Sequence, residues 1–110
     1  MKLPAGNRAI VELAKIERYA LAPEHEEGKH KARVFAAALG LGREHSGWLR
    51  ERLLDAARTR DCIATGTTRF GTRYAIDFLL NHAGRSAMLR SCWIVRVEED
   101  FPRLTTCYVL

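Results

Sequence analysis

The chain has 110 residues, of which 47% are hydrophobic and 28% charged, and its formal net charge is +5. These values exclude a disordered or low-complexity protein and predict one domain, residues 1–110, that buries roughly 60–70% of its unfolded surface. No apolar run approaches the ~18–20 residues of a membrane-spanning helix. The first residues also lack the apolar stretch of a secretion signal, so we expect a cytoplasmic protein.

Hydrophobic spacing predicts three helices in the first part of the chain. The first covers roughly residues 12–20, and a proline-containing loop follows it. The second runs from about Lys29 to Leu39, with Phe35 and Leu39 on one apolar face. The third runs from about Arg43 to Thr59.

After Arg60 the hydrophobic period changes to two, which is typical of strands. Strands are predicted around residues 73–80, 86–97 and 104–110, with a hairpin loop at 81–84 and turns near two glycines, Gly66 and Gly71. Helices followed by a meander indicate an α+β domain. We expect about three N-terminal helices packed on one face of an antiparallel β-meander of three to four strands.

The segment GKHKARVF places His30, Lys31 and Arg33 at the start of the second predicted helix. Lys31 precedes Phe35 by four residues, so it is expected at the edge of the core. Cations at a helix N-terminus oppose the helix dipole, and a bound anion would relieve that conflict. Together with His25, the cluster has the acids, bases and cations that metal-independent RNA cleavage needs. The alternative is a solvated helix end.

A second candidate set lies on the last two predicted strands. Alternation puts Ser91 and Trp93 on one face of their strand, and Thr106 and Tyr108 on one face of the next. Their hydroxyls, together with Arg96, are suited to hold a phosphate, and an aromatic ring can stack on an unpaired base. The alternative is ordinary strand composition, because Thr, Tyr and Trp favour strands.

Metal and cofactor motifs are not found in the sequence. The histidines do not have metal-ligand spacing, and no glycine-rich nucleotide motif is present. The three cysteines form no CxxC pair and are expected to be reduced. The excess of arginine in the second half makes RNA a candidate partner, bound electrostatically and with little sequence preference. We expect no metal and no cofactor.

Three stretches carry a family resemblance: YALAPEHEEGKHKARVFAAALGL, RYAIDF and RSCWIVRVEEDFPRLTTCYVL. They resemble a small bacterial family known only as a domain of unknown function. The HKARVF motif and the RLTTCYV ending are also similar to C-terminal RNase modules of polymorphic and contact-dependent toxins. Those modules belong to the group of barnase, the EndoU nucleases, the colicin nucleases and the RelE toxins. The loop departs from the pattern in having Glu26 where a proline is expected.

The resemblance implies a metal-independent RNase toxin that leaves a 2′,3′-cyclic phosphate, with a cognate antitoxin or immunity protein encoded nearby. It assigns catalytic roles to His30, Lys31, Arg33, Ser91, Arg96 and Thr106. It assigns substrate binding to His25, Trp93 and Tyr108. The alternative is a non-catalytic antitoxin, immunity or regulatory partner. Convergence of His30, Lys31, Arg96 and Thr106 in one open cleft would favour catalysis, whereas dispersal over different faces would favour the binding module.

Overall fold

The computed structural model describes residues 1–110. The helical part comprises a 3₁₀ turn η1 (Gly6–Arg8), α1 (Leu13–Lys15), a π-helical turn η2 (Ile16–Ala20), α2 (Lys29–Leu39), a 3₁₀ turn η3 (Arg43–His45) and α3 (Ser46–Thr59). The strands are β1 (Ile63–Thr68), β2 (Gly71–His82), β3 (Arg85–Arg96) and β4 (Pro102–Val109). The predicted bounds of the second helix are confirmed, and the first helix is α-helical only at its start.

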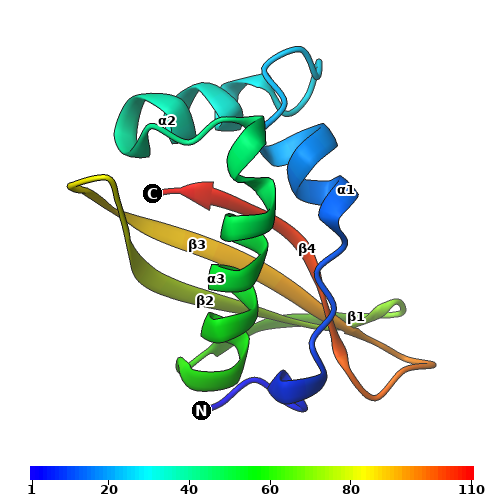
Figure 1. Ribbon diagram of the computed structural model, residues 1–110. Coiled ribbons are helices and arrows are strands. Elements are labelled where there is room, and N and C mark those ends of the chain that lie inside the picture. Colours follow the sequence, from blue (N-terminus) through cyan, green and yellow to red (C-terminus); the bar gives the residue numbers. More distant parts are fainter.

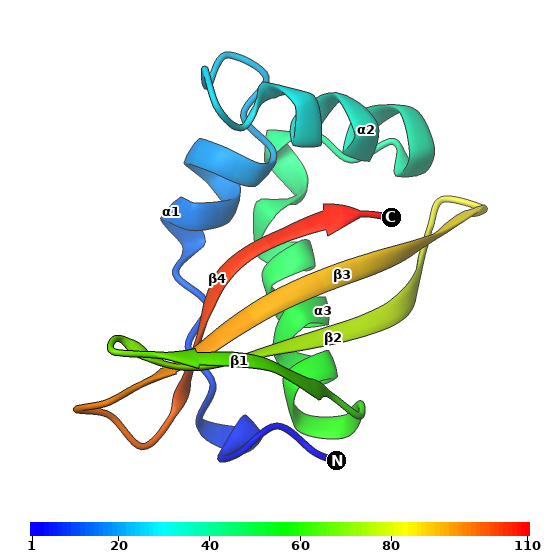
Figure 2. The ribbon, with the colours of Figure 1, turned by 180° about the vertical axis from the view of Figure 1, so that it is seen from behind.

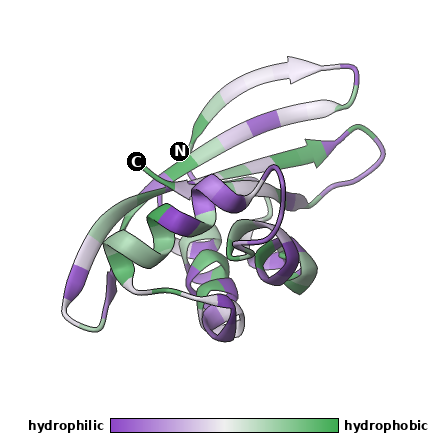
Figure 3. Cartoon of the chain, turned by 90° about the horizontal axis from the view of Figure 1, so that it is seen from above, coloured by the Kyte–Doolittle hydropathy of each residue, from purple (hydrophilic) through white to green (hydrophobic).

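The four strands form one antiparallel sheet in the order β1-β2-β3-β4, which confirms the predicted α+β fold with a meander. α3 crosses one face of this sheet, and the turned view shows the opposite face without a helix (Figures 1 and 2). Seen from above, the helices and the sheet form two layers (Figure 3). α1 and α2 lie toward the β4 side, where α2 contacts β4 and β3. The sheet therefore has a core face under α3 and an open face.

Phe35 and Leu39 anchor α2 in the core, because both are fully buried. They belong to the same buried cluster as Ile76 and Phe78, as the matching of helical and strand apolar faces predicts. The strands that α2 contacts are β3 and β4, whereas β2 contacts α3. Burial of Phe35 and Leu39 therefore fixes the rotation of α2 about its axis, and with it the side of the helix that faces the end of β4.

Two glycines predicted as turn residues lie within strands. Gly66 lies inside β1, where the register with β2 shifts. Gly71 is the first residue of β2, with a φ of 149°, and a Cβ there would collide with the Val95 carbonyl oxygen. The close approach of β3 therefore requires glycine at this position.

A β-bulge in β4 sets the direction of its side chains. Cys92 of β3 pairs with Thr106, but the next residue, Trp93, pairs with Leu104, so Thr105 is an extra residue. Leu104 and Cys107 are buried on the core face. Thr106 and Tyr108 consequently point to the opposite side and lie on the open face.

Candidate functional site

Lys31 lies where α2 meets the edge of the sheet. Its ammonium donates a hydrogen bond to Thr106 Oγ1 at 3.0 Å. The Nζ atom lies 5.0 Å from the ring centroid of Tyr19 and 5.7 Å from that of Tyr108. The side chain is half-buried, in agreement with the predicted position at the core edge. No carboxylate lies within ion-pair distance of this lysine.

The helix period explains this placement. Phe35 is fully buried and lies one turn after Lys31, so the two side chains leave α2 on the same side. The anchor in the core thereby directs Lys31 toward β4. The apolar stem packs while the charged end remains partly solvated, and the two aromatic faces stabilise the charge.

One shallow hollow is lined by Lys31, and a second is lined by Tyr19, whose ring lies 5.0 Å from the Lys31 ammonium. The Tyr108 hollow has a volume of about 280 Å³ and is lined by His30, Lys31, Val34, Tyr108 and Val109. The Tyr19 hollow has a volume of about 270 Å³ and is lined by Ala14, Lys15, Tyr19 and Thr105. The structure therefore brings four of the residues selected from sequence to one place, namely His30, Lys31, Thr106 and Tyr108.

Arg33 and Arg96 lie elsewhere. Arg33 is exposed and lines another hollow with Glu24 and Glu44. Arg96 is the last residue of β3 and lies 4.0 Å from the carboxylate of Glu99. Neither arginine lines the Tyr19 hollow or the Tyr108 hollow, so Arg96 does not converge with His30, Lys31 and Thr106.

Ser91 and Trp93 lie in the core, not in an open site. Both are completely buried on the core face of β3. The Trp93 indole N–H donates to Ser91 Oγ at 2.9 Å, and the Ser91 hydroxyl donates to the Ile76 carbonyl at 3.0 Å. Their polar groups are therefore satisfied inside the protein, and this geometry leaves them no contact with a substrate.

His25 shapes the loop before α2. Its Nδ1 accepts hydrogen bonds from the backbone N–H groups of Glu27 and Gly28, at 3.1 and 3.0 Å. Its ring also packs edge-on against Tyr19, with 4.7 Å between centroids. His25 therefore supports the ring of Tyr19 and the start of the helix. Lys29, in the first turn, forms a 3.5 Å ion pair with Glu26 in the same loop.

Tyr19 and Arg90 were not selected from the sequence. Tyr19 lies in the π-helical turn, whose wider spacing departs from the helical period used for prediction. Arg90 binds Asp77 on the neighbouring strand through two hydrogen bonds of 2.8 Å. The arginine holds the pKa of Asp77 below its usual value. Opposite charges on paired strands can identify an ion pair such as Asp77–Arg90 from the sequence, but only when the pairing register of the strands is known.

The cysteines are free thiols. Burial raises the pKa of Cys92 on the open face, and it raises the pKa of Cys107 on the core face to about 12. A catalytic cysteine needs a lowered pKa instead. Neither thiol is activated.

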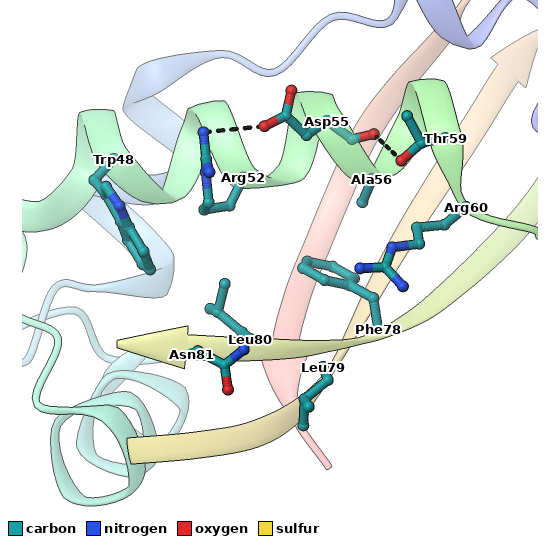
Figure 4. Close-up of a pocket in the computed structure, with 10 residues that line it drawn as sticks. All are labelled: Trp48, Arg52, Asp55, Ala56, Thr59, Arg60, Phe78, Leu79, Leu80 and Asn81. Atoms are coloured by element: carbon teal, nitrogen blue, oxygen red, sulfur yellow. Dashed lines mark hydrogen bonds and ion pairs between the residues drawn. The ribbon is translucent and has the colours of Figure 1, made fainter. Parts of the chain in front are cut away.

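A further hollow of about 280 Å³ lies between α3 and β2 (Figure 4). It contains none of the residues selected from sequence. In this hollow Arg52 pairs with Asp55 at 3.0 Å.

No group of three or more His, Cys, Asp or Glu residues in the chain is arranged to hold a metal ion. No helix has the length and hydropathy that crossing a membrane requires.

Comparisons with known proteins place the chain in a family and a fold. The model of the family "Domain of unknown function (DUF6883)" matches residues 2–110. A solved structure titled as a contact-dependent growth inhibition toxin and immunity protein complex from Klebsiella pneumoniae 342 contains a chain with the same fold. The TM-score is 0.73 at 12% identity, covering 92% of this chain and 99% of that one. No curated protein matches the sequence.

Proposed function

We propose that this chain, which belongs to the DUF6883 family, is a metal-independent RNase toxin of a bacterial toxin–immunity or toxin–antitoxin system. The observation that carries the proposal is the half-buried Lys31 ammonium, hydrogen-bonded to Thr106 and without a carboxylate partner. A partly desolvated cation that no acid neutralises is suited to an anionic ligand. The fold shared with a chain of a toxin–immunity complex supports a role in a toxin system, either as the toxin or as its immunity protein.

The residues around Lys31 match the needs of RNA cleavage. The 2′-oxygen attacks the phosphorus and loses its proton to a base, while the 5′-oxygen leaves and gains a proton. The products are a 2′,3′-cyclic phosphate and a 5′-hydroxyl. His30, which borders the same hollow, acts as the acid or the base, and water completes the other proton transfer. Lys31 stabilises the charge that builds up on the phosphate oxygens, and Thr106 positions Lys31.

The test is cleavage of total bacterial RNA by the purified chain, with and without a metal chelator. The wild type should cleave in both conditions and leave cyclic phosphate ends. His30→Ala should reduce the rate by about 10²–10⁴-fold. Lys31→Met keeps most of the apolar length but removes the charge, and should reduce the rate by about 10²–10³-fold.

Arg33→Ala is the matched control, because Arg33 lies on the same helix and is exposed, but borders a different hollow. Its activity should equal that of the wild type, and circular dichroism should show all variants folded. Equal losses in Arg33→Ala and Lys31→Met would contradict the assignment of the site.

The proposal also includes a small partner encoded nearby that blocks the toxin. Induced expression of the chain alone should arrest growth, and co-expression of the neighbouring gene product should restore it. If the purified chain cuts no RNA, even when freed of that partner, the alternative of a non-catalytic immunity or antitoxin protein replaces the RNase.

A further inference from the structure

Resting on the proposed RNase function, we infer that the substrate is single-stranded RNA whose two bases on either side of the cleaved phosphate occupy the Tyr19 hollow and the Tyr108 hollow. Lys31, whose ammonium lies 5.0 Å from the ring centroid of Tyr19 and 5.7 Å from that of Tyr108, binds the phosphate. This assigns substrate positioning to Tyr19, and it predicts which form of RNA the protein selects.

The first argument is the order of the contacts along β4. Thr105 lines the Tyr19 hollow, Thr106 receives the Lys31 hydrogen bond, and Tyr108 and Val109 line the Tyr108 hollow. With roughly 3.3 Å of rise per strand residue, these positions succeed one another over about the length of a dinucleotide step and its flanking rings. The Lys31 ammonium is thus bonded to the β4 residue that lies between Thr105 of one hollow and Tyr108 of the other.

The second argument is that each hollow contains one tyrosine ring and one lysine. One is lined by Tyr19 and Lys15, and the other by Tyr108 and Lys31, with His30 at its border. Neither Lys15 nor Lys31 has an ion-pair partner within the chain. Aromatic rings beside cations are the usual combination that binds unpaired bases and their backbone.

The third argument is size. At about 270 and 280 Å³, each hollow is smaller than the ~300–1,000 Å³ of pockets for drug-sized ligands. Each therefore has room for one base. In a duplex the bases are stacked and paired, so they cannot separate to contact two rings. Only a single strand, with its bases turned out, can use both hollows.

The experiment measures binding at fixed salt of a hexanucleotide RNA that is 2′-O-methylated and so cannot be cut. It is offered as a single strand and annealed to its complement. The wild type should bind the single strand at least about 10-fold more tightly than the duplex. Tyr19→Ala and Tyr108→Ala should each lose about 10-fold for the single strand, whereas Tyr19→Phe and Tyr108→Phe should retain binding.

Phe70→Ala is the control, because Phe70 is 57% exposed and lies in the β1–β2 turn, outside both hollows. Equal binding of single strand and duplex, no binding of either, or equal losses in Tyr19→Ala and Phe70→Ala would overturn the inference. If any of these three results is found while the chain still cleaves RNA and the cleavage depends on Lys31, the proposed RNase function holds and only the two base-binding sites are wrong. If both tyrosines support binding but no RNA is cut, the subsites stand and the RNase function fails.

Discussion

The two faces of the sheet carry similar polar and aromatic residues, but these residues have different partners on each face. On the core face, the hydroxyl of Ser91 and the indole of Trp93 bind each other and a backbone carbonyl. No buried side-chain nitrogen or oxygen in the chain lacks a hydrogen-bond partner. On the open-face side, the ammonium of Lys31 meets one hydroxyl and two aromatic rings, and no carboxylate. Residue type alone does not distinguish a polar group that is fully paired inside the protein from one that has no charged partner.

The largest effect should come from the core face. Trp93→Ala removes a completely buried aromatic side chain from the centre of the sheet. It should lower the free energy of unfolding by about 3–5 kcal/mol, measured by chemical denaturation. Loss of less than about 1 kcal/mol would mean that the core face does not depend on this residue.

Two hydroxyl deletions test the difference between the two faces. Ser91→Ala leaves the Trp93 indole N–H buried without its acceptor and should cost about 1–3 kcal/mol of stability. Thr106→Ala removes a hydroxyl from the half-buried edge, where water can replace it, and should cost less than about 1 kcal/mol. Denaturation curves of both variants, with RNA cleavage assayed alongside, test this difference. Thr106→Ala should affect cleavage more than stability, and the reverse order of stability losses would contradict the distinction between the faces.

The smallest effect should come from the Asp77–Arg90 pair on the open face. Both side chains are more than one-third exposed, so the pair should contribute less than about 1 kcal/mol. Because Arg90 lowers the pKa of Asp77, this stability is present above the unfolded pKa of about 3.9 and is lost as pH falls through the folded pKa. Wild type and Arg90→Gln should therefore differ in unfolding free energy at pH 7 and converge in strong acid. A difference that stays the same at every pH would exclude the ion pair as its source.

Periodicity was enough to predict α2, α3 and the strands β2 to β4, but not β1, whose residues are all exposed and show no alternation. The apolar positions Phe35 and Leu39 define the buried side of α2, and the two-residue period after Arg60 defines the meander. Both patterns depend only on residues close together in the sequence, so they can be recognised without knowledge of the tertiary structure. The position of Lys31 at the core edge follows from the same helical period.

The composition of the site depended on information that periodicity does not contain. Grouping Ser91 and Trp93 with Thr106 and Tyr108 requires the pairing between β3 and β4, which the bulge at Thr105 sets. A shift of one residue exchanges the faces of a strand. Arg33 illustrates a second limit, because two residues along a helix turn a side chain by about 200° away from Lys31. Shared chemistry in one short motif therefore does not imply a shared site.

The bulge also constrains how this protein can diverge. Leu104 and Thr106 are two residues apart yet face opposite sides of the sheet, since Thr105 interrupts the alternation between them. Loss or gain of one codon in this stretch would send Thr106 and Tyr108 to the core and bring Cys107 to the surface. Substitutions on the open face change one contact at a time, but a change of length here disrupts the core and the site together. Related sequences should therefore tolerate insertions in the loop at 97–101 far more readily than within the last strand.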